Sequence, residues 1–175
     1  ETAGQANRIL AEYLAGQSEA GVLQTAAHEL VHALDDRAAG LLPIGRSAVW
    51  LAEGRANHLG FAVRGRRVLP GVVSVPATDN ILVRLQEAVD GADLRALVAL
   101  DKRGFMGEGS ARHYALSWAF VHFLFHAEGG RYAPGFRAYL QGLPAKAAAA
   151  HLEKAVGPLS ALEPAFRRYV KEELI

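Results

Sequence analysis

The sequence predicts a mainly helical domain with at most a small β hairpin or edge strand. Apolar residues recur along most of the chain at the spacing of amphipathic helices. Glycines and prolines stand where the helical runs would end or begin. The chain has 175 residues, and its hydrophobic fraction of 51% is ample for one sizeable core. We therefore expect a single domain over residues 1–175.

Apolar spacing places four helices in the first part of the chain. The expected ranges are Glu19 to Asp36, Ser47 to Leu59, Asn80 to Val89 and Ala92 to Leu100. Ser47 has the type of side chain that caps a helix N-terminus. Gly91 separates the last two ranges, because glycine weakens the interior of a helix.

The second part of the chain continues as helices. Ser110 is placed to cap a long helix that runs to about His126, where the sequence AEGG ends it. Three prolines then stand near the starts of three more helices, where the missing N–H of proline costs least: Pro134, Pro144 and Pro158. These segments predict an array of helices.

Only two segments favour strands. The range Phe61 to Val75 has β-branched runs around a glycine, which is typical of a hairpin or an irregular ribbon. The range Asn7 to Leu14 is compatible with either a short strand or a short helix, since periodicity does not distinguish them.

Charge and hydropathy exclude several classes of partner. Nineteen Lys and Arg residues against eighteen Asp and Glu leave a formal net charge of +1, so no nucleic-acid partner is expected. The basic run Arg64 to Arg67 is explained by a solvated turn. The longest apolar stretch, Tyr114 to Phe125, contains a histidine and is too short for a membrane span.

The residue inventory also limits the chemistry. The chain has no cysteine, so any metal must be held by His, Asp or Glu. The compartment stays open, and the lack of cysteine is compatible with an extracytoplasmic bacterial protein. The chain does not begin with methionine and opens without a signal-like region, so we expect it to be part of a longer protein.

The sequence HELVH places two histidines one helical turn apart, with a glutamate directly after the first. On a helix, His28, Glu29 and His32 fall on one side, with about 6 Å between the Cβ atoms of the histidines. Both imidazoles can then reach a single zinc ion. Glu29 is offset by one position, which suits contact with a metal-bound water better than ligation.

The alternative to a zinc site is a helix with two surface histidines. The other residues of the helix help to decide between the two. Four apolar side chains fall roughly opposite the histidines and predict the face that packs on the protein. They are Leu23, Ala27, Leu30 and Leu34. Because the helix is apolar nearly all round, we expect it to be buried, and buried polar groups need partners.

A third ligand is expected from the next helix. Glu53 lies inside this range, with Trp50 and Asn57 on the same helical face. An acid between a tryptophan and an amide is typical of an inward-facing side chain. The alternative is a surface glutamate without a ligand role.

These motifs together resemble those of the gluzincin metallopeptidases. HELVH is followed by WLAEG, Trp50 to Gly54, and the segment His113 to Leu143 is similar to the part of aminopeptidase-like gluzincins where a tyrosine opens a helix. The matching tyrosine is Tyr114, and the small residue after it is Ser117. The tail resembles the closing helices of bacterial peptidase-MA-like proteins, so the resemblance runs from about Gly21 onward.

The resemblance implies a zincin-like helical domain that hydrolyses peptide bonds with one zinc ion per chain. His28, His32 and Glu53 would hold the metal, and the fourth position would take a water whose pKa falls towards neutrality. Glu29 would be the general base. Tyr114, placed in the first turn of its helix, would donate a hydrogen bond to the oxyanion.

Two further residues are expected to hold the imidazoles in the required tautomer. They are Asn57, one turn beyond Glu53, and Asp36, one turn beyond His32. The remaining histidines are assigned structural or surface roles: His58, His113, His122, His126 and His151.

The resemblance implies a peptide or protein substrate, without fixing endo- or exopeptidase action. The exopeptidase loop and the N-terminal β-lobe of the aminopeptidases have no counterpart in the 27 residues that precede His28. We therefore expect an additional N-terminal lobe in the same protein. The alternative function is that of a non-catalytic helical binding module or a degenerate, zinc-loaded peptidase domain.

Overall fold

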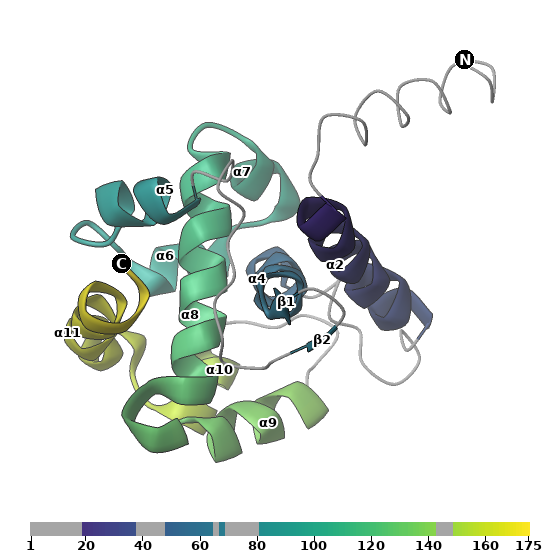
Figure 1. Ribbon diagram of the computed structural model, residues 1–175. Coiled ribbons are helices and arrows are strands. Elements are labelled where there is room, and N and C mark those ends of the chain that lie inside the picture. The colour runs from purple at the N-terminus through teal and green to yellow at the C-terminus, as the bar shows by residue number, and fades with distance from the viewer. Residues whose placement is uncertain (1–18, 38–47, 65–66, 69–80, 143–148) are drawn as a thin grey trace.

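The computed structural model describes residues 19–37, 48–64, 67–68, 81–142 and 149–175 (Figure 1). This part of the chain is mainly helical, which confirms the predicted fold class. The longer helices are α2 (Glu19–Arg37), α4 (Val49–Phe61), α8 (Ser110–Gly130) and α11 (Leu159–Tyr169), and the shorter ones are α5 (Ile81–Ala88), α6 (Leu94–Ala99), α7 (Lys102–Met106), α9 (Ala133–Gln141) and α10 (Ala149–Val156). A π-helical turn, η1 (Val170–Leu174), ends the chain.

Helix α4 lies between α2 and α8 and packs on both (Figure 1). A glycine allows the close approach on each side. A Cβ on Gly54 would lie 2.6 Å from the carbonyl oxygen of Ser117 in α8. A Cβ on Gly60 would lie 3.1 Å from the carbonyl oxygen of Gln24 in α2. The two faces of α4 are therefore fixed against different neighbours.

Helix α8 is the central helix of the core. Its side chains from Ala115 to Leu124 are all buried, because this stretch is apolar nearly all round. Helical geometry breaks at Ala127, and Glu128 and Gly129 adopt positive φ angles of 51° and 68°, as the predicted stop requires.

No helix of the described residues is long and apolar enough to cross a membrane.

Several helix starts differ from the predictions. The N-cap of α8 is Gly109, with φ of 82°, so the expectation that Ser110 caps this helix is wrong. Ala48 stands at the N-cap of α4 without a side-chain hydrogen bond, and Ser47 lies outside the described residues. Helix α7 was not predicted, because its five residues are too few to show periodicity.

The other starts follow ordinary capping chemistry. Asp93 begins α6 by accepting a hydrogen bond from the Ala96 N–H. Pro134 lies in the first turn of α9 and Pro158 is the N-cap of α11, so both stand near the start of a helix as predicted. Pro144 lies outside the described residues.

A small antiparallel hairpin follows α4. Strand β1 (Val63–Arg64) pairs with β2 (Arg67–Val68), and Val63 lies opposite Val68. This hairpin confirms the strand prediction for residues 63–64 and 67–68 of the range Phe61 to Val75, whereas Phe61 itself ends α4. The end of that range and the segment Asn7 to Leu14 lie outside the described residues.

Helix α2 packs by the opposite face from the one predicted. Gln24, Val31 and Asp35 are buried, whereas Leu30 and Leu34 are 58% and 56% exposed. The expectation that the leucine face packs on the protein is therefore wrong. The physical reason is that α4 offers polar partners to α2, so the ionisable face of α2 is the one that turns inward.

One of these polar contacts is an ion pair between Arg55 of α4 and the buried Asp35 of α2. Arg55 of α4 donates from one guanidinium nitrogen to both carboxylate oxygens of Asp35, each at 3.0 Å. The Asp35 side chain is only 7% exposed. A buried carboxylate without a cation is costly, so this pair holds α2 in place beside α4.

We expect Arg55→Met to lower the free energy of unfolding of the metal-free protein by about 3 kcal/mol, because the Asp35 carboxylate stays buried without its partner. Urea unfolding followed by circular dichroism measures the effect. The matched control is Arg84→Met, which removes an exposed pair with Glu87 and should cost less than about 1 kcal/mol. Equal destabilisation by the two variants would contradict the assigned role of Arg55.

Candidate metal centre

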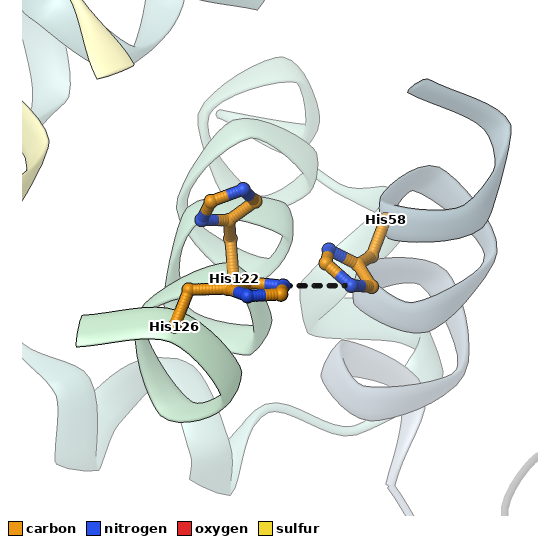
Figure 2. A group of neighbouring side chains, drawn as sticks. All are labelled: His58, His122 and His126. Atoms are coloured by element: carbon orange, nitrogen blue, oxygen red, sulfur yellow. Dashed lines mark hydrogen bonds between the residues drawn. The ribbon is translucent and has the colours of Figure 1, made fainter. Parts of the chain in front are cut away.

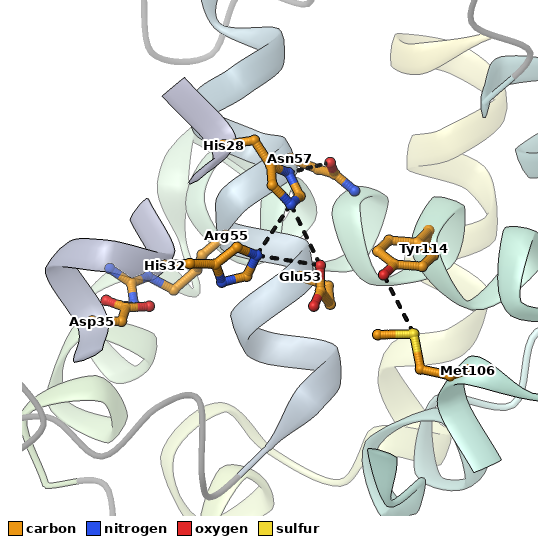
Figure 3. A network of polar contacts seen from close by, with 8 residues as sticks. All are labelled: His28, His32, Asp35, Glu53, Arg55, Asn57, Met106 and Tyr114. Atoms are coloured by element: carbon orange, nitrogen blue, oxygen red, sulfur yellow. Dashed lines mark hydrogen bonds and ion pairs between the residues drawn. The ribbon is translucent and has the colours of Figure 1, made fainter. Parts of the chain in front are cut away.

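The facing sides of α2 and α4 bring together two histidines and a glutamate (Figure 3). His28 and His32 are one turn apart on α2, and their Nε2 atoms lie 3.1 Å apart. Oε2 of Glu53 on α4 lies 3.5 Å from His28 Nε2 and 3.4 Å from His32 Nε2. The three side chains could hold a metal ion between them.

The spacing of these three atoms fits zinc. Zinc bonds of about 2.0–2.2 Å in tetrahedral geometry separate neighbouring ligand atoms by about 3.3 Å. The observed separations of 3.1, 3.4 and 3.5 Å lie close to that value. The side chains of His28, His32 and Glu53 are 20%, 28% and 13% exposed, so the group is partly sheltered and can still be reached by an ion.

Asn57 fixes the orientation of His28. Its amide oxygen lies 2.8 Å from His28 Nδ1. Because this oxygen can only accept, Nδ1 carries a proton, and Nε2, on the side of His32 and Glu53, is the nitrogen left to bind a cation. A hydrogen bond of this kind, on the ring nitrogen away from the metal, holds a ligand histidine in one tautomer.

The charges of the cluster favour a cation between these residues. Burial lowers the pKa of His28, but the hydrogen bond and the negative charge of Glu53 outweigh it, and the pKa is raised above its usual value. Burial raises the pKa of Glu53, but the hydrogen bond to His28 and the charges of the two histidines outweigh it and lower the pKa. Without a metal, a proton takes the place of the cation.

We expect Asn57→Leu to weaken zinc binding at this group by about 10–100-fold, because it removes the acceptor that fixes the His28 ring while keeping a similar volume. Competition with a chelator of known zinc affinity measures the change. Gln86→Leu, on an exposed position of α5, is the control and should leave the affinity unaltered. An affinity unaffected by Asn57→Leu would remove this residue from the metal centre.

Glu29 is exposed and is not one of the three candidate ligands. Its negative charge nevertheless contributes to raising the pKa values of both His28 and Tyr114. Its carboxylate therefore acts electrostatically on two residues from different helices beside the group. Glu29 thus lies beside the group, exposed to solvent and outside the ligand set.

Tyr114 approaches Glu53 from α8. It is the fifth residue of that helix, so it lies just beyond the first turn, in which it was expected. Its hydroxyl donates to Met106 Sδ at 3.5 Å, a weak bond that a better acceptor would replace (Figure 3). Burial, and then the charge of Glu53, raise the pKa of Tyr114 to about 12, so the hydroxyl stays protonated.

Three other residues singled out in the sequence do not belong to the candidate ligand group. Asp36 lies within α2, but its side chain lies outside the described part of the structure. Ser117 is fully buried, and its carbonyl oxygen is the atom that Gly54 accommodates. His113 Nδ1 lies 2.9 Å from the carbonyl oxygen of Phe105, which suits its assigned structural role.

The structure contains a second histidine group that was not predicted from the sequence. His58 of α4 and His122 and His126 of α8 lie together and could also hold a metal ion (Figure 2). The one-turn spacing of His122 and His126 was a visible signal, but the sequence did not show that His58 faces them. Burial and neighbouring basic side chains lower the pKa of His58 to about 3, and burial also lowers that of His126.

Comparisons of the chain with protein-family models, with curated proteins and with solved structures find no match. The candidate metal centre therefore depends on the geometry and chemistry of its own side chains.

Proposed function

We propose that this domain is a zinc metallopeptidase of the gluzincin type. The observation that carries the proposal is the triangle of His28 Nε2, His32 Nε2 and Glu53 Oε2, with edges of 3.1, 3.4 and 3.5 Å. Two imidazoles and one carboxylate form a ligand set of catalytic zinc sites, which keep a fourth position open. Glu29 follows His28 directly and stays outside this triangle.

Zinc bound here would polarise the substrate carbonyl as a Lewis acid and bring the pKa of a water molecule towards neutrality. Glu29 accepts the proton of that water and later passes it to the leaving amine. Asn57 keeps His28 in the tautomer that leaves Nε2 free to bind. The ion pair of Asp35 and Arg55 holds α2, and with it both histidines, against α4.

Tyr114 stabilises the charge that develops on the carbonyl oxygen. Its hydroxyl is protonated at neutral pH and exchanges the weak contact with Met106 for this stronger acceptor. A protonated donor that is already positioned costs little reorganisation when the negative charge appears.

We expect Tyr114→Phe to keep zinc and fold but to lower turnover by about 10²-fold, the usual scale for the loss of one such donor. Steady-state hydrolysis of a fluorogenic peptide measures the change. The control is Tyr132→Phe, at the start of α9, which should leave turnover unaffected. A full rate in Tyr114→Phe would return Tyr114 to a packing role.

The substrate is a peptide or protein, and an additional N-terminal lobe of the same protein is expected to contribute to its binding. If this lobe completes the substrate cleft, the 175-residue chain should cleave unstructured peptides slowly by itself. A longer chain with more N-terminal sequence should cleave them faster. An equal rate for the two chains would show that the cleft is complete in the shorter one.

The test of the proposed function is a peptide-library digest with the zinc-loaded and the metal-free protein, analysed by mass spectrometry. We expect cleavage products only with zinc, and their ends distinguish endo- from exopeptidase action. Bound zinc without any products, also from the longer chain, would instead support a degenerate peptidase domain used for binding. The absence of bound zinc would support a helical module without metal chemistry.

A further inference from the structure

A second cluster of potential ligands lies on the other side of α4 from the metal centre. His58 comes from the face of α4 that packs on α8, one turn after Gly54. His122 and His126 come from successive turns of α8, and their rings gather beside that of His58 (Figure 2). This histidine triad joins the two helices that form the middle of the core.

The three rings are close enough for one ion. One nitrogen from each ring lies within 4.8 Å of those from the other two. Nε2 of His58 and Nε2 of His126 are 3.5 Å apart, close to the ligand separation of about 3.3 Å in a tetrahedral zinc site. The ring centres of His122 and His126 are 4.5 Å apart.

Burial makes the triad costly without a ligand. His58 and His122 are only 8% and 5% exposed. His58 Nδ1 is buried and has no hydrogen-bond partner within the described part of the chain. A buried polar atom without a partner destabilises a fold by about 1–3 kcal/mol. A metal on His58 Nε2 would leave Nδ1 as it is, so it is the burial and spacing of the three rings that point to a metal.

Tyr169 holds the ring of His122. The Tyr169 hydroxyl of α11 lies 2.7 Å from His122 Nδ1. Because Nδ1 is engaged in this way, the metal ligand of the ring would be Nε2. Ligand histidines are commonly oriented through the ring nitrogen that does not bind the metal.

The ligand chemistry selects the type of ion. The triad offers three imidazole nitrogens and no carboxylate, which suits zinc, copper or nickel and does not suit calcium or magnesium. The charge of Arg55 acts on His58 and that of Arg137 on His126, and Arg55 is paired with Asp35. His126 is half-buried, so an ion and a fourth ligand from solvent can reach the triad from its side.

We propose that His58, His122 and His126 form a second metal site, which binds one imidazole-preferring transition-metal ion and ties α4 to α8. The site is structural, since it contains no acid that could serve as a general base. It lies next to Ala127, where the helical geometry of α8 ends, and thus fixes the last regular turn of that helix. The proposal does not depend on peptidase activity.

The experiment is a zinc titration of the metal-free protein without an affinity tag, with zinc measured by elemental analysis after desalting. We expect about two equivalents for the wild type, one for Glu53→Ala and one for His126→Gln. The double variant should bind none. His151→Gln removes an exposed histidine and should still bind two. His58→Gln provides a second test of the triad from the other helix.

The outcomes separate the two sites. If the Glu53→Ala variant binds one equivalent of zinc and the added His126→Gln substitution removes it, the result supports the histidine triad. This conclusion holds even if the metal centre at Glu53 binds no zinc. A Glu53→Ala variant without zinc, or a folded His126→Gln variant that keeps two equivalents, would overturn the proposal. Zinc should also raise the melting temperature of Glu53→Ala, because binding to the native state alone stabilises it.

Tyr169→Phe tests the positioning of His122. It keeps the ring and removes the hydroxyl, so zinc affinity of the triad should fall by about 10–100-fold in the Glu53→Ala background. Tyr139→Phe is the control, since Tyr139 lies on α9 and its ring stacks on that of Phe136. An unchanged affinity in Tyr169→Phe would contradict this role of Tyr169.

Discussion

Glu29→Gln should lower peptide hydrolysis by about 10²–10⁴-fold while the protein keeps its zinc and its fold. The amide that replaces the carboxylate cannot accept a proton from water, but it has nearly the same size. Glu29 is exposed and lies outside the group of candidate ligands, so neither packing nor metal binding depends on it. Hydrolysis rate, zinc content and unfolding midpoint are measured on the same preparation.

The matched control for Glu29→Gln is Glu108→Gln, which changes another exposed glutamate and should leave the rate unaffected. Hydrolysis at the wild-type rate by the zinc-loaded Glu29→Gln protein would assign the base to another residue. Loss of zinc together with activity would indicate that Glu29 acts as a ligand, which its place in α2 does not favour.

Glu53→Ala should remove most of the zinc from the metal centre on dialysis. The variant leaves two imidazoles and deletes the carboxylate whose charge attracts a cation to His28 and His32. It is best measured in the His126→Gln background, where the histidine triad no longer contributes zinc. Elemental analysis should then fall from about one equivalent to nearly none.

Two variants complete the Glu53 test. Glu53→Gln keeps the shape of the side chain and removes its charge, so it should lose zinc as well. Glu87→Ala changes an exposed glutamate of α5 and should retain the full equivalent. Full zinc retention by Glu53→Ala in the His126→Gln background would remove Glu53 from the centre.

The part of the site that lies within one helix could be read from the sequence. The pitch of an α-helix fixes the spacing of His28 and His32, and their Nε2 atoms do meet, at 3.1 Å. Glu53 and Asn57 could be chosen because they share a face of a second helix with Trp50. Local periodicity therefore predicted which residues share a face of each helix, but it did not predict that these two faces pack on each other.

Features that depend on packing between distant segments could not be predicted. The sequence favoured the leucine face of α2 as the packed one, because it did not reveal that α4 offers Arg55 to Asp35. The close approach at Gly54 depends on the position of Ser117 in α8. The histidine triad likewise depends on the rotation of α4 between its two neighbours.

Whether zinc binds between α2 and α4 is tested most directly in crystals of the zinc-loaded protein. Anomalous diffraction at the zinc edge locates the ion there. We expect a peak about 2 Å from His28 Nε2, His32 Nε2 and Glu53 Oε2. A second peak at His58, His122 and His126 is compatible with it. Zinc-loaded crystals without a peak between α2 and α4 would contradict the proposed metal centre.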